Sequence, residues 1–199
     1  MEVLKLSQVD ISNQFGDLHK LKEIIDRLEN AARAGGQVVC KIRVNGLLFS
    51  ERDEERFSNT SVADISDIEV ELEEVSVLMR ESSRALLNYC QDLRSAVLIT
   101  AEESRDGFDH RVHKRFTEIV SSIQWLTEAL IVLRNSYRAN GAHFGDGNHW
   151  TETEVQSVAA VRELMDAYKS RDFVRVSDVL EYEISTLLER WERYLQPAC

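Results

Sequence analysis

The spacing of apolar residues changes once along this chain, close to residue 75. Before that point, apolar and polar residues alternate over several short runs, which is the pattern of strands with one solvated face. Beyond it, apolar residues recur every three to four positions, as they do on one face of an amphipathic helix. The chain has one proline, Pro197, so no proline interrupts this helical stretch. The pattern predicts two domains, a small one at residues 1–74 and a helical one at residues 75–199.

The alternating runs and the turn signals between them predict a small β-α-β-β-β module in the first domain. Gly35-Gly36 ends the helical stretch of this module, because glycine readily adopts the left-handed conformation that closes a helix. Asn45-Gly46 is a strong hairpin signal, since both residues tolerate a positive φ. The predicted elements are a strand at 2–6, a helix between 18 and 35, and strands at 37–44, 47–49 and 65–73.

The second domain holds four amphipathic stretches with short connections, which favours an antiparallel four-helix bundle. The first two stretches are about 30 residues long and the last two about 20, so two helices are long. Shorter helices leave part of the long pair uncovered, and an exposed apolar surface of this kind marks an interaction. We expect the small module, a second copy of the chain or a partner protein to cover it. The predicted fold class is therefore α+β, mostly α.

The charge and the cysteines of the chain restrict its partners and its location. The formal net charge is −11, so the chain lacks the broad positive field that attracts phosphate groups. Direct binding to nucleic acid or to an anionic membrane is therefore disfavoured, and the sequence has no run of about 18 apolar residues that predicts a membrane span. The cysteines are odd in number and form no CxxC pair, which favours a reducing compartment. We expect a cytoplasmic protein of bacterial type.

Acidic and aromatic side chains are the candidates for partner binding. In the run from Asp64 to Glu74, acids occupy one face of a predicted strand, which forms either a solvated face or a docking surface for a basic partner. Trp125 lies at the edge of a predicted core stripe, and Trp150 lies at the start of a predicted helix as a candidate hydrophobic staple. Aromatic residues at an edge are either partly buried or part of an interface. The candidate partner-binding residues are Asp64, Asp67, Glu69, Glu71, Trp125 and Trp150.

Two pairs of histidines are candidate metal ligands. His110 and His113 lie three residues apart at the start of a predicted helix, a spacing that can place two imidazoles on one ion. His143 and His149 lie in a glycine-rich connection over residues 140–150, where glycine lets the backbone approach a ligand. The alternatives are a solvated helix turn and a flexible connection. The first pair has no third ligand at a known spacing and the second matches no nucleotide-binding motif, so we predict no cofactor.

The last predicted helix shows a resemblance to a known family. The stretch from Asp172 to Trp191, DFVRVSDVLEYEISTLLERW, has a break at an aspartate, a helix with a Leu-Glu step and a closing tryptophan. It resembles the last helix of the flagellin export chaperone family, whose members are small helical bundles that hold an unfolded export substrate against their apolar surface. The resemblance is confined to this stretch, carries no binding residues over, and implies a bacterial helical accessory protein.

The lack of a catalytic motif in the sequence, together with the surplus helix surface, favours a non-enzymatic protein-interaction factor. Such a factor would be an adaptor, an accessory protein or a chaperone-like bundle that binds a protein partner through apolar helix surface. The first alternative is a structural homodimer, in which the long helices pack against their symmetry mates. The second is a small-ligand or metal-binding protein that uses the connection over residues 140–150.

Overall fold

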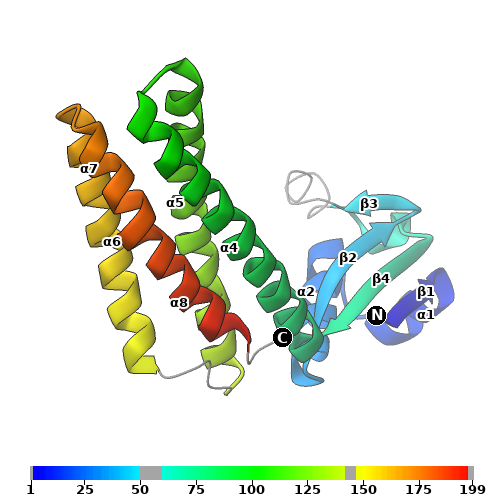
Figure 1. Ribbon diagram of the computed structural model, residues 1–199. Helices are drawn as coiled ribbons and strands as arrows, with labels where there is room; N and C mark the ends of the chain where they lie inside the picture. Colours follow the sequence, from blue (N-terminus) through cyan, green and yellow to red (C-terminus); the bar gives the residue numbers. More distant parts are fainter. Residues whose placement is uncertain (1, 50–59, 142–146, 197–199) are drawn as a thin grey trace. The chain divides into compact units, whose positions relative to one another are not determined.

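The computed structural model describes residues 2–49, 60–141 and 147–196, and the chain divides into two compact units, Met1–Leu78 and Met79–Cys199 (Figure 1). The predicted fold class, α+β and mostly α, is confirmed, with a small antiparallel sheet in the first unit and helices in the second. The division falls inside the first helical turns after the sheet rather than before them. No loop separates the sheet from the helix, because the last strand ends at Glu74 and the next helix begins at Val75.

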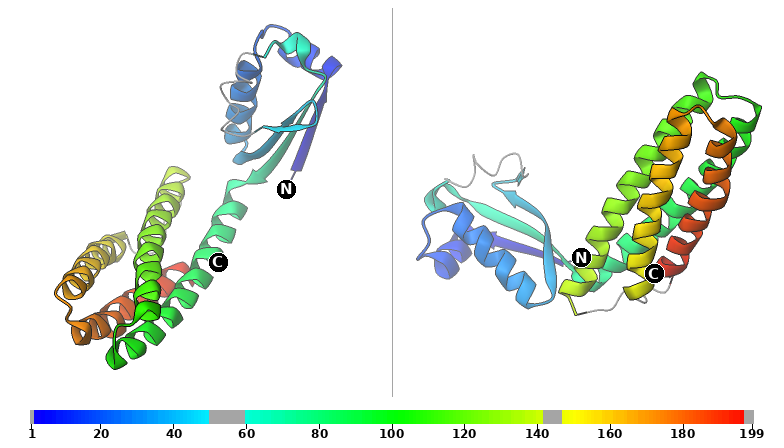
Figure 2. Two further views of the ribbon diagram at one scale, coloured as in Figure 1. Left: turned by 90° about the horizontal axis from the view of Figure 1, so that it is seen from above. Right: turned by 90° about the vertical axis from the view of Figure 1, so that its left-hand side faces the viewer.

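The sheet of the first unit has the strand order β1-β4-β2-β3, and each neighbouring pair is antiparallel. Two helices connect β1 to β2, and both lie on one side of the sheet (Figure 2). The described elements of this unit are β1 (Glu2–Ser7), α1 (Gln8–Phe15), α2 (Leu21–Ala34), β2 (Gln37–Val44), β3 (Leu47–Phe49), the 3-10 turn η2 (Val62–Asp64) and β4 (Asp67–Glu74).

Helix α1 is an addition to the predicted β-α-β-β-β order. The Ser7 hydroxyl accepts a hydrogen bond from the backbone N–H of Asp10, and the Asp10 carboxylate accepts one from the N–H of Ser7 at 2.9 Å. This capping box satisfies two backbone donors of the first turn. Ile11 and Phe15, one turn apart, are then both buried. Sequence reasoning missed the helix because it is short and its few apolar residues give no clear period.

Alternate residues of strands β1, β2 and β4 face the helices and form the core of the first unit. Their side chains point to one side because the side-chain period of a strand is two. Burying each one contributes roughly 1.5–3 kcal/mol, before the cost of ordering the chain. The buried residues that form this core include Leu6, Ile42, Val44, Ile68 and Val70 from the sheet and Leu21, Ile24 and Ile25 from α2.

The predicted hairpin turn between β2 and β3 is confirmed. Asn45 and Gly46 have φ values of 51° and 75°, the left-handed conformation that a tight hairpin turn needs. The Asn45 side chain also ties the turn to the segment before β4. Its amide donates to the carbonyl oxygen of Asp64 at 3.0 Å, and its Oδ1 accepts from the backbone N–H of Ser66 at 2.8 Å. The turn is therefore held by side-chain hydrogen bonds as well as by the β2–β3 ladder.

The described part of the second unit is an antiparallel four-helix bundle, as predicted, with two long helices (Figures 1 and 2). Its fourth helix is continuous but changes its winding, because a π-helical segment lies between two α-helical ones. The elements of this unit are α4 (Val75–Asp106), α5 (His110–Ala139), α6 (Gly147–Lys169), α7 (Phe173–Asp178), the π-helical segment η3 (Val179–Ile184) and α8 (Ser185–Leu195).

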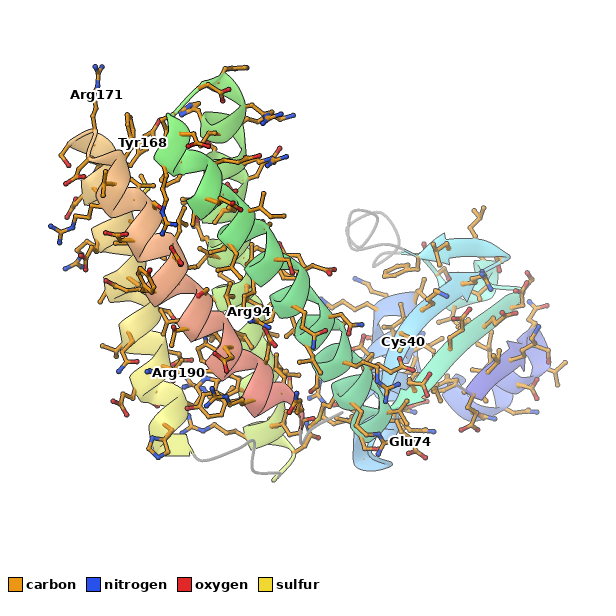
Figure 3. All side chains as sticks on the ribbon, viewed as in Figure 1. Cys40, Glu74, Arg94, Tyr168, Arg171 and Arg190 are labelled. Atoms are coloured by element: carbon orange, nitrogen blue, oxygen red, sulfur yellow. The ribbon has the colours of Figure 1, made fainter. Side chains whose placement is uncertain are left out.

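Polar contacts bridge each of the four sides of the bundle. They establish that α4 neighbours α5 and α8, and that α6 neighbours the same two helices. Figure 3 shows Arg94 between α4 and α8, and Arg190 between α8 and α6. The bridging pairs are Ser83–Tyr137 for α4 and α5, Arg134–Glu154 for α5 and α6, Arg190–Gln156 for α8 and α6, and Arg94–Glu192 for α4 and α8.

Candidate functional site

An apolar groove runs along the outside of the bundle between α4 and α5. The groove has a volume of about 460 Å³. It is lined at helical spacing by residues of each helix, of which Leu93 and Ile119 also belong to the buried core stripes and the others lie beside them. Ile99 is 51% exposed there, although isoleucine is usually buried. The apolar residues that line the groove are Tyr89, Leu93, Ala96, Ile99 and Ile119.

Trp125 of α5 extends this apolar surface beside the groove. Its ring meets the ring of Tyr89 edge to face, with the centroids 4.7 Å apart and the planes at 62°. The pair joins the two helices on their outer side, yet Trp125 keeps 51% of its surface exposed. Aromatic residues in this position are the side chains that interfaces most often use as anchors. The structure therefore places the sequence candidate Trp125 next to a groove.

The charged residues that line the groove leave it with an acidic character. Arg115 is paired with Glu103 at 2.5 Å, so its charge is compensated. Glu118 has only a loose contact with Lys114 at 3.8 Å. Asp92 is exposed and has no ion-pair partner among the residues that the structure describes. Asp92 on one helix and Glu118 on the other thus carry negative charge at the groove.

Helix α5 is more apolar than its packing in the bundle requires. Among the described helices, it is the one that is long and apolar enough to cross a membrane by length and composition alone. Only 33% of its most apolar 18-residue stretch is buried. Its inward stripe is buried against the other helices, from Val112 to Tyr137. Its outward side still exposes Val132 and Ile131 as well as Trp125. Exposed apolar side chains also lie on the other helices, Val155 and Val158 on α6 among them, so what distinguishes the outer side of α5 is the aromatic ring of Trp125 next to the groove.

Comparison with known families assigns the bundle to one of them. A family model described as "Domain of unknown function (DUF8042)" matches residues 81–194, which is more than half of the chain. The chain belongs to this family. No curated protein and no solved structure matches it. The resemblance to the flagellin export chaperones is not tested by these comparisons and stays a prediction. Both helices of the groove lie largely within the DUF8042 region, whereas the sheet of the first unit lies outside it.

The structure corrects the prediction that Trp150, which also lies in the DUF8042 region, is a partner-binding residue. Trp150 is 1% exposed and therefore cannot belong to an exposed partner-binding surface. Its ring lies 4.6 Å from the ring of Trp191, centroid to centroid, and its indole N–H donates to Glu154 at 2.8 Å. Burial of a tryptophan is favourable when its N–H finds such an acceptor. Trp150 is part of the bundle core near the start of α6.

The four acidic candidates lie in the first unit, outside the DUF8042 region. Glu71 is 8% exposed and pairs with Lys41 at 2.8 Å. Glu69 lies between Lys5 at 2.9 Å and Arg43 at 3.0 Å, and the hydrogen bond from Lys5 lowers the pKa of the Glu69 carboxyl. Bases on the neighbouring strands lie opposite these two acids and compensate their charge, which leaves less charge for a basic partner.

The other two acids, Asp64 and Asp67, are exposed. They lie at the end of the sheet next to the Asn45 turn, where the carbonyl oxygen of Asp64 accepts from the Asn45 amide. With Glu69 and Glu71 paired inside the sheet, these two aspartates do not make a continuous acidic surface with them.

The structure separates the candidate histidines. His110 and His113 line one cavity at the end of the bundle, where the Nδ1 atom of His113 is hydrogen-bonded to the Tyr168 hydroxyl. His149 lies on α6, 3.7 Å from Glu152, and His143 lies outside the described residues. Within the described residues, no group of three or more histidine, cysteine or acidic side chains could hold a metal ion.

Sequence reasoning missed the groove itself. Its signal was present as a second stripe on α4, in which Tyr89, Ala96 and Ile99 recur at helical spacing beside the core stripe. On α5 the matching signal is Trp125, which lies beside the core stripe rather than in it. Two stripes on one helix indicate that the helix has apolar neighbours on two sides.

Proposed function

We propose that this protein is a non-enzymatic interaction factor whose α4–α5 groove binds an amphipathic helix of another protein. The observation that carries the proposal is the exposed apolar surface of the groove, with Ile99 and Trp125 each half exposed on a well-packed bundle. Leaving such side chains in water is unfavourable, and an apolar partner surface would remove that cost.

The shape of the groove favours a helix as the occupant. Two helices that run side by side form a channel into which a third helix can place side chains at positions i, i+3 or i+4, and i+7. The Tyr89–Trp125 pair would supply the aromatic anchor beside this channel, and Ile99 the aliphatic contact within it. The occupant would then complete an additional layer on the outside of the bundle.

The charge of the groove favours a basic partner. Asp92 and Glu118 place negative charge on the two helices that border it, and the net charge of the whole chain is −11. A helix with lysine or arginine beside its apolar stripe would be attracted over long distances and oriented by these acids. A second copy of this chain would bring the same two acids and the same net charge, so charge repulsion disfavours a homodimer through this groove.

Site-specific photo-crosslinking with the full chain tests the proposal. A benzophenone side chain replaces Ile99 in the groove, and the matched control carries it in place of Val158, which is 56% exposed on α6. Both proteins are irradiated in extract of the source organism, and the peptide joined to the probe is identified by mass spectrometry. We expect the probe at position 99 to label one segment with apolar residues at helical spacing and a net positive charge.

Three other outcomes would overturn the proposal. A crosslink from position 99 to a second copy of this chain would establish the homodimer in its place. Equal labelling from positions 99 and 158 would show contact without a specific groove. Labelling of an acidic or non-helical segment from position 99 would remove the chemistry on which the choice of partner rests.

A further inference from the structure

A second cavity lies at one end of the bundle, where the α4–α5 and α6–α7 connections meet. Its volume is about 510 Å³, within the usual range for small-molecule sites. It shares no lining residue with the α4–α5 groove, so a ligand in this cavity would be independent of the proposed function. Aromatic rings and basic side chains line it together: Phe108, Tyr168 and Phe173 with His110, Lys169 and Arg171.

The aromatic side of the cavity is held in place by ring stacking. Phe108 stacks on Phe173 with the centroids 4.5 Å apart and the planes at 12°. Tyr168 stacks on the buried ring of Phe116 at 4.4 Å and 17°, and its hydroxyl is hydrogen-bonded to His113. These contacts fix the rings before any ligand arrives. A flat apolar group placed against them would meet a preformed surface.

The basic side of the cavity carries charge without compensation. Neighbouring bases at this end of the bundle pair with acids, as Arg175 does with Glu163 at 2.6 Å. In the described part of the chain, by contrast, neither the Lys169 ammonium nor the Arg171 guanidinium has a carboxylate partner. The two cations lie together at one cavity without an ion pair of their own, and they match an anionic ligand.

The acid that lines the cavity, Asp109, is engaged by the backbone of α5 rather than by Lys169 or Arg171. The Asp109 carboxylate accepts hydrogen bonds from the backbone N–H groups of Arg111 at 2.8 Å and Val112 at 2.9 Å. The same bonds occupy donors at the start of α5, so an anion would be held by the side chains of the cavity and not by the helix terminus.

The backbone of Arg171 adds an independent observation. Its φ is 59°, a left-handed conformation that costs a residue with a Cβ atom free energy and that glycine or asparagine would adopt more readily. Figure 3 shows the Arg171 side chain extending from the end of the bundle, beyond Tyr168. The Arg171 guanidinium thus lies at the rim of the cavity, and the backbone conformation of Arg171 costs folding free energy that a glycine there would not cost.

We propose that this cavity binds a small organic anion that carries a flat ring. Its phosphate or carboxylate group would pair with Arg171 and Lys169, and its ring would lie against Phe108, Phe173 and Tyr168. The bidentate geometry of a guanidinium suits either anion.

Calorimetric titration of the full chain with phenyl phosphate tests this proposal. Inorganic phosphate, which lacks the ring, and benzyl alcohol, which lacks the charge, are the partial probes. We expect phenyl phosphate to bind in a saturable manner and more tightly than either. Arg171→Ala and Lys169→Ala should each weaken binding about tenfold, the usual size of a lost charge-assisted contact. Arg138→Ala is the matched control, because Arg138 is an exposed arginine at the other end of α5 and lies outside the cavity.

Arg171→Gly keeps the test independent of folding. Glycine relieves the left-handed backbone, so this variant should melt at or above the temperature of the wild type and still bind phenyl phosphate as weakly as Arg171→Ala. Any of three results would overturn the proposal: no saturable binding up to about 10 mM phenyl phosphate, equal affinities for phenyl phosphate and inorganic phosphate, or the same affinity in the Arg171 and Arg138 variants.

Discussion

Replacing Trp150 and Trp125 in turn separates the core of the bundle from its exposed surface. Trp150 is 1% exposed, and a buried tryptophan removes about 150–250 Å² from water. At about 25 cal/mol per Å² this gives roughly 4–6 kcal/mol as an upper estimate, and truncations of this kind in protein cores cost about 3–5 kcal/mol. We therefore expect Trp150→Ala to lower the free energy of unfolding by about 4 kcal/mol.

Trp125→Ala should cost far less, because half of the residue is already in water and the space left behind is open to solvent. What it loses is mainly the edge-to-face contact with Tyr89, which is worth about 0.5–1.5 kcal/mol. The change in free energy of unfolding should be about 1 kcal/mol.

Thermal unfolding followed by circular dichroism measures the difference. In a protein of this size about 1 kcal/mol shifts the melting temperature by about 2–4 °C. We expect a fall of about 8–16 °C for Trp150→Ala and of about 4 °C or less for Trp125→Ala. Equal falls, or a larger one for Trp125→Ala, would refute the placement of the two side chains, because both tryptophans would then contribute alike to the core.

Three further predictions concern single residues. In a Cys199→Ser background, Cys40 should react with a thiol reagent in the folded protein, while Cys90 should stay protected until unfolding. The reason is that burial, with a smaller contribution from a nearby glutamate, raises the pKa of Cys90 to about 12. Equal reaction rates for the two thiols would contradict this. Hydrogen bonds from the backbone of α5 lower the pKa of Asp109. The stability lost in Asp109→Asn should therefore be full at neutral pH and shrink as the pH falls below about 4, where the wild-type carboxylate is protonated too; a difference that grows in acid would show that the cap is not ionic. Asn45→Ala should destabilise the first unit by about 1–3 kcal/mol in urea unfolding. The substitution removes the side-chain hydrogen bonds of the β2–β3 turn and leaves a residue that is poorly suited to a positive φ. An unchanged urea midpoint would contradict the role of Asn45 in holding the turn.

Local patterns were sufficient to predict most of the elements. The Asn45-Gly46 turn, the strands on either side of it and the helices of the bundle each have a signal within a few residues, in turn chemistry or in apolar spacing. Helix α1 also had such a signal, the Ser7–Asp10 capping box, but it competed with the pattern of the preceding strand. The π-helical segment η3 has no signal in the apolar pattern, which continues through it.

The candidate sites depended on long-range packing, and sequence reasoning was weaker there. Trp125 lies at the edge of an apolar stripe and Trp150 at the start of a helix, and only the neighbouring helices decide that the first is exposed and the second enclosed. The bases that pair with Glu69 and Glu71 come from other strands, so the pairing depends on the strand register and not on the local sequence. The cavity at the end of the bundle joins Phe108 to Phe173, residues that are far apart in the sequence and meet only when the bundle closes.

The central claim, that the α4–α5 groove binds a basic amphipathic helix, is tested most directly by a titration with two synthetic peptides. Both carry leucine at positions i, i+4, i+7 and i+11, and the opposite face is lysine in one peptide and glutamate in the other. We predict that the lysine peptide binds the wild-type chain about tenfold more tightly than the glutamate peptide. We also predict that Ile99→Asp abolishes this binding and that Val158→Asp leaves it unchanged. Equal affinities for the two peptides, no binding of either, or the same affinity in the two variants would contradict the claim.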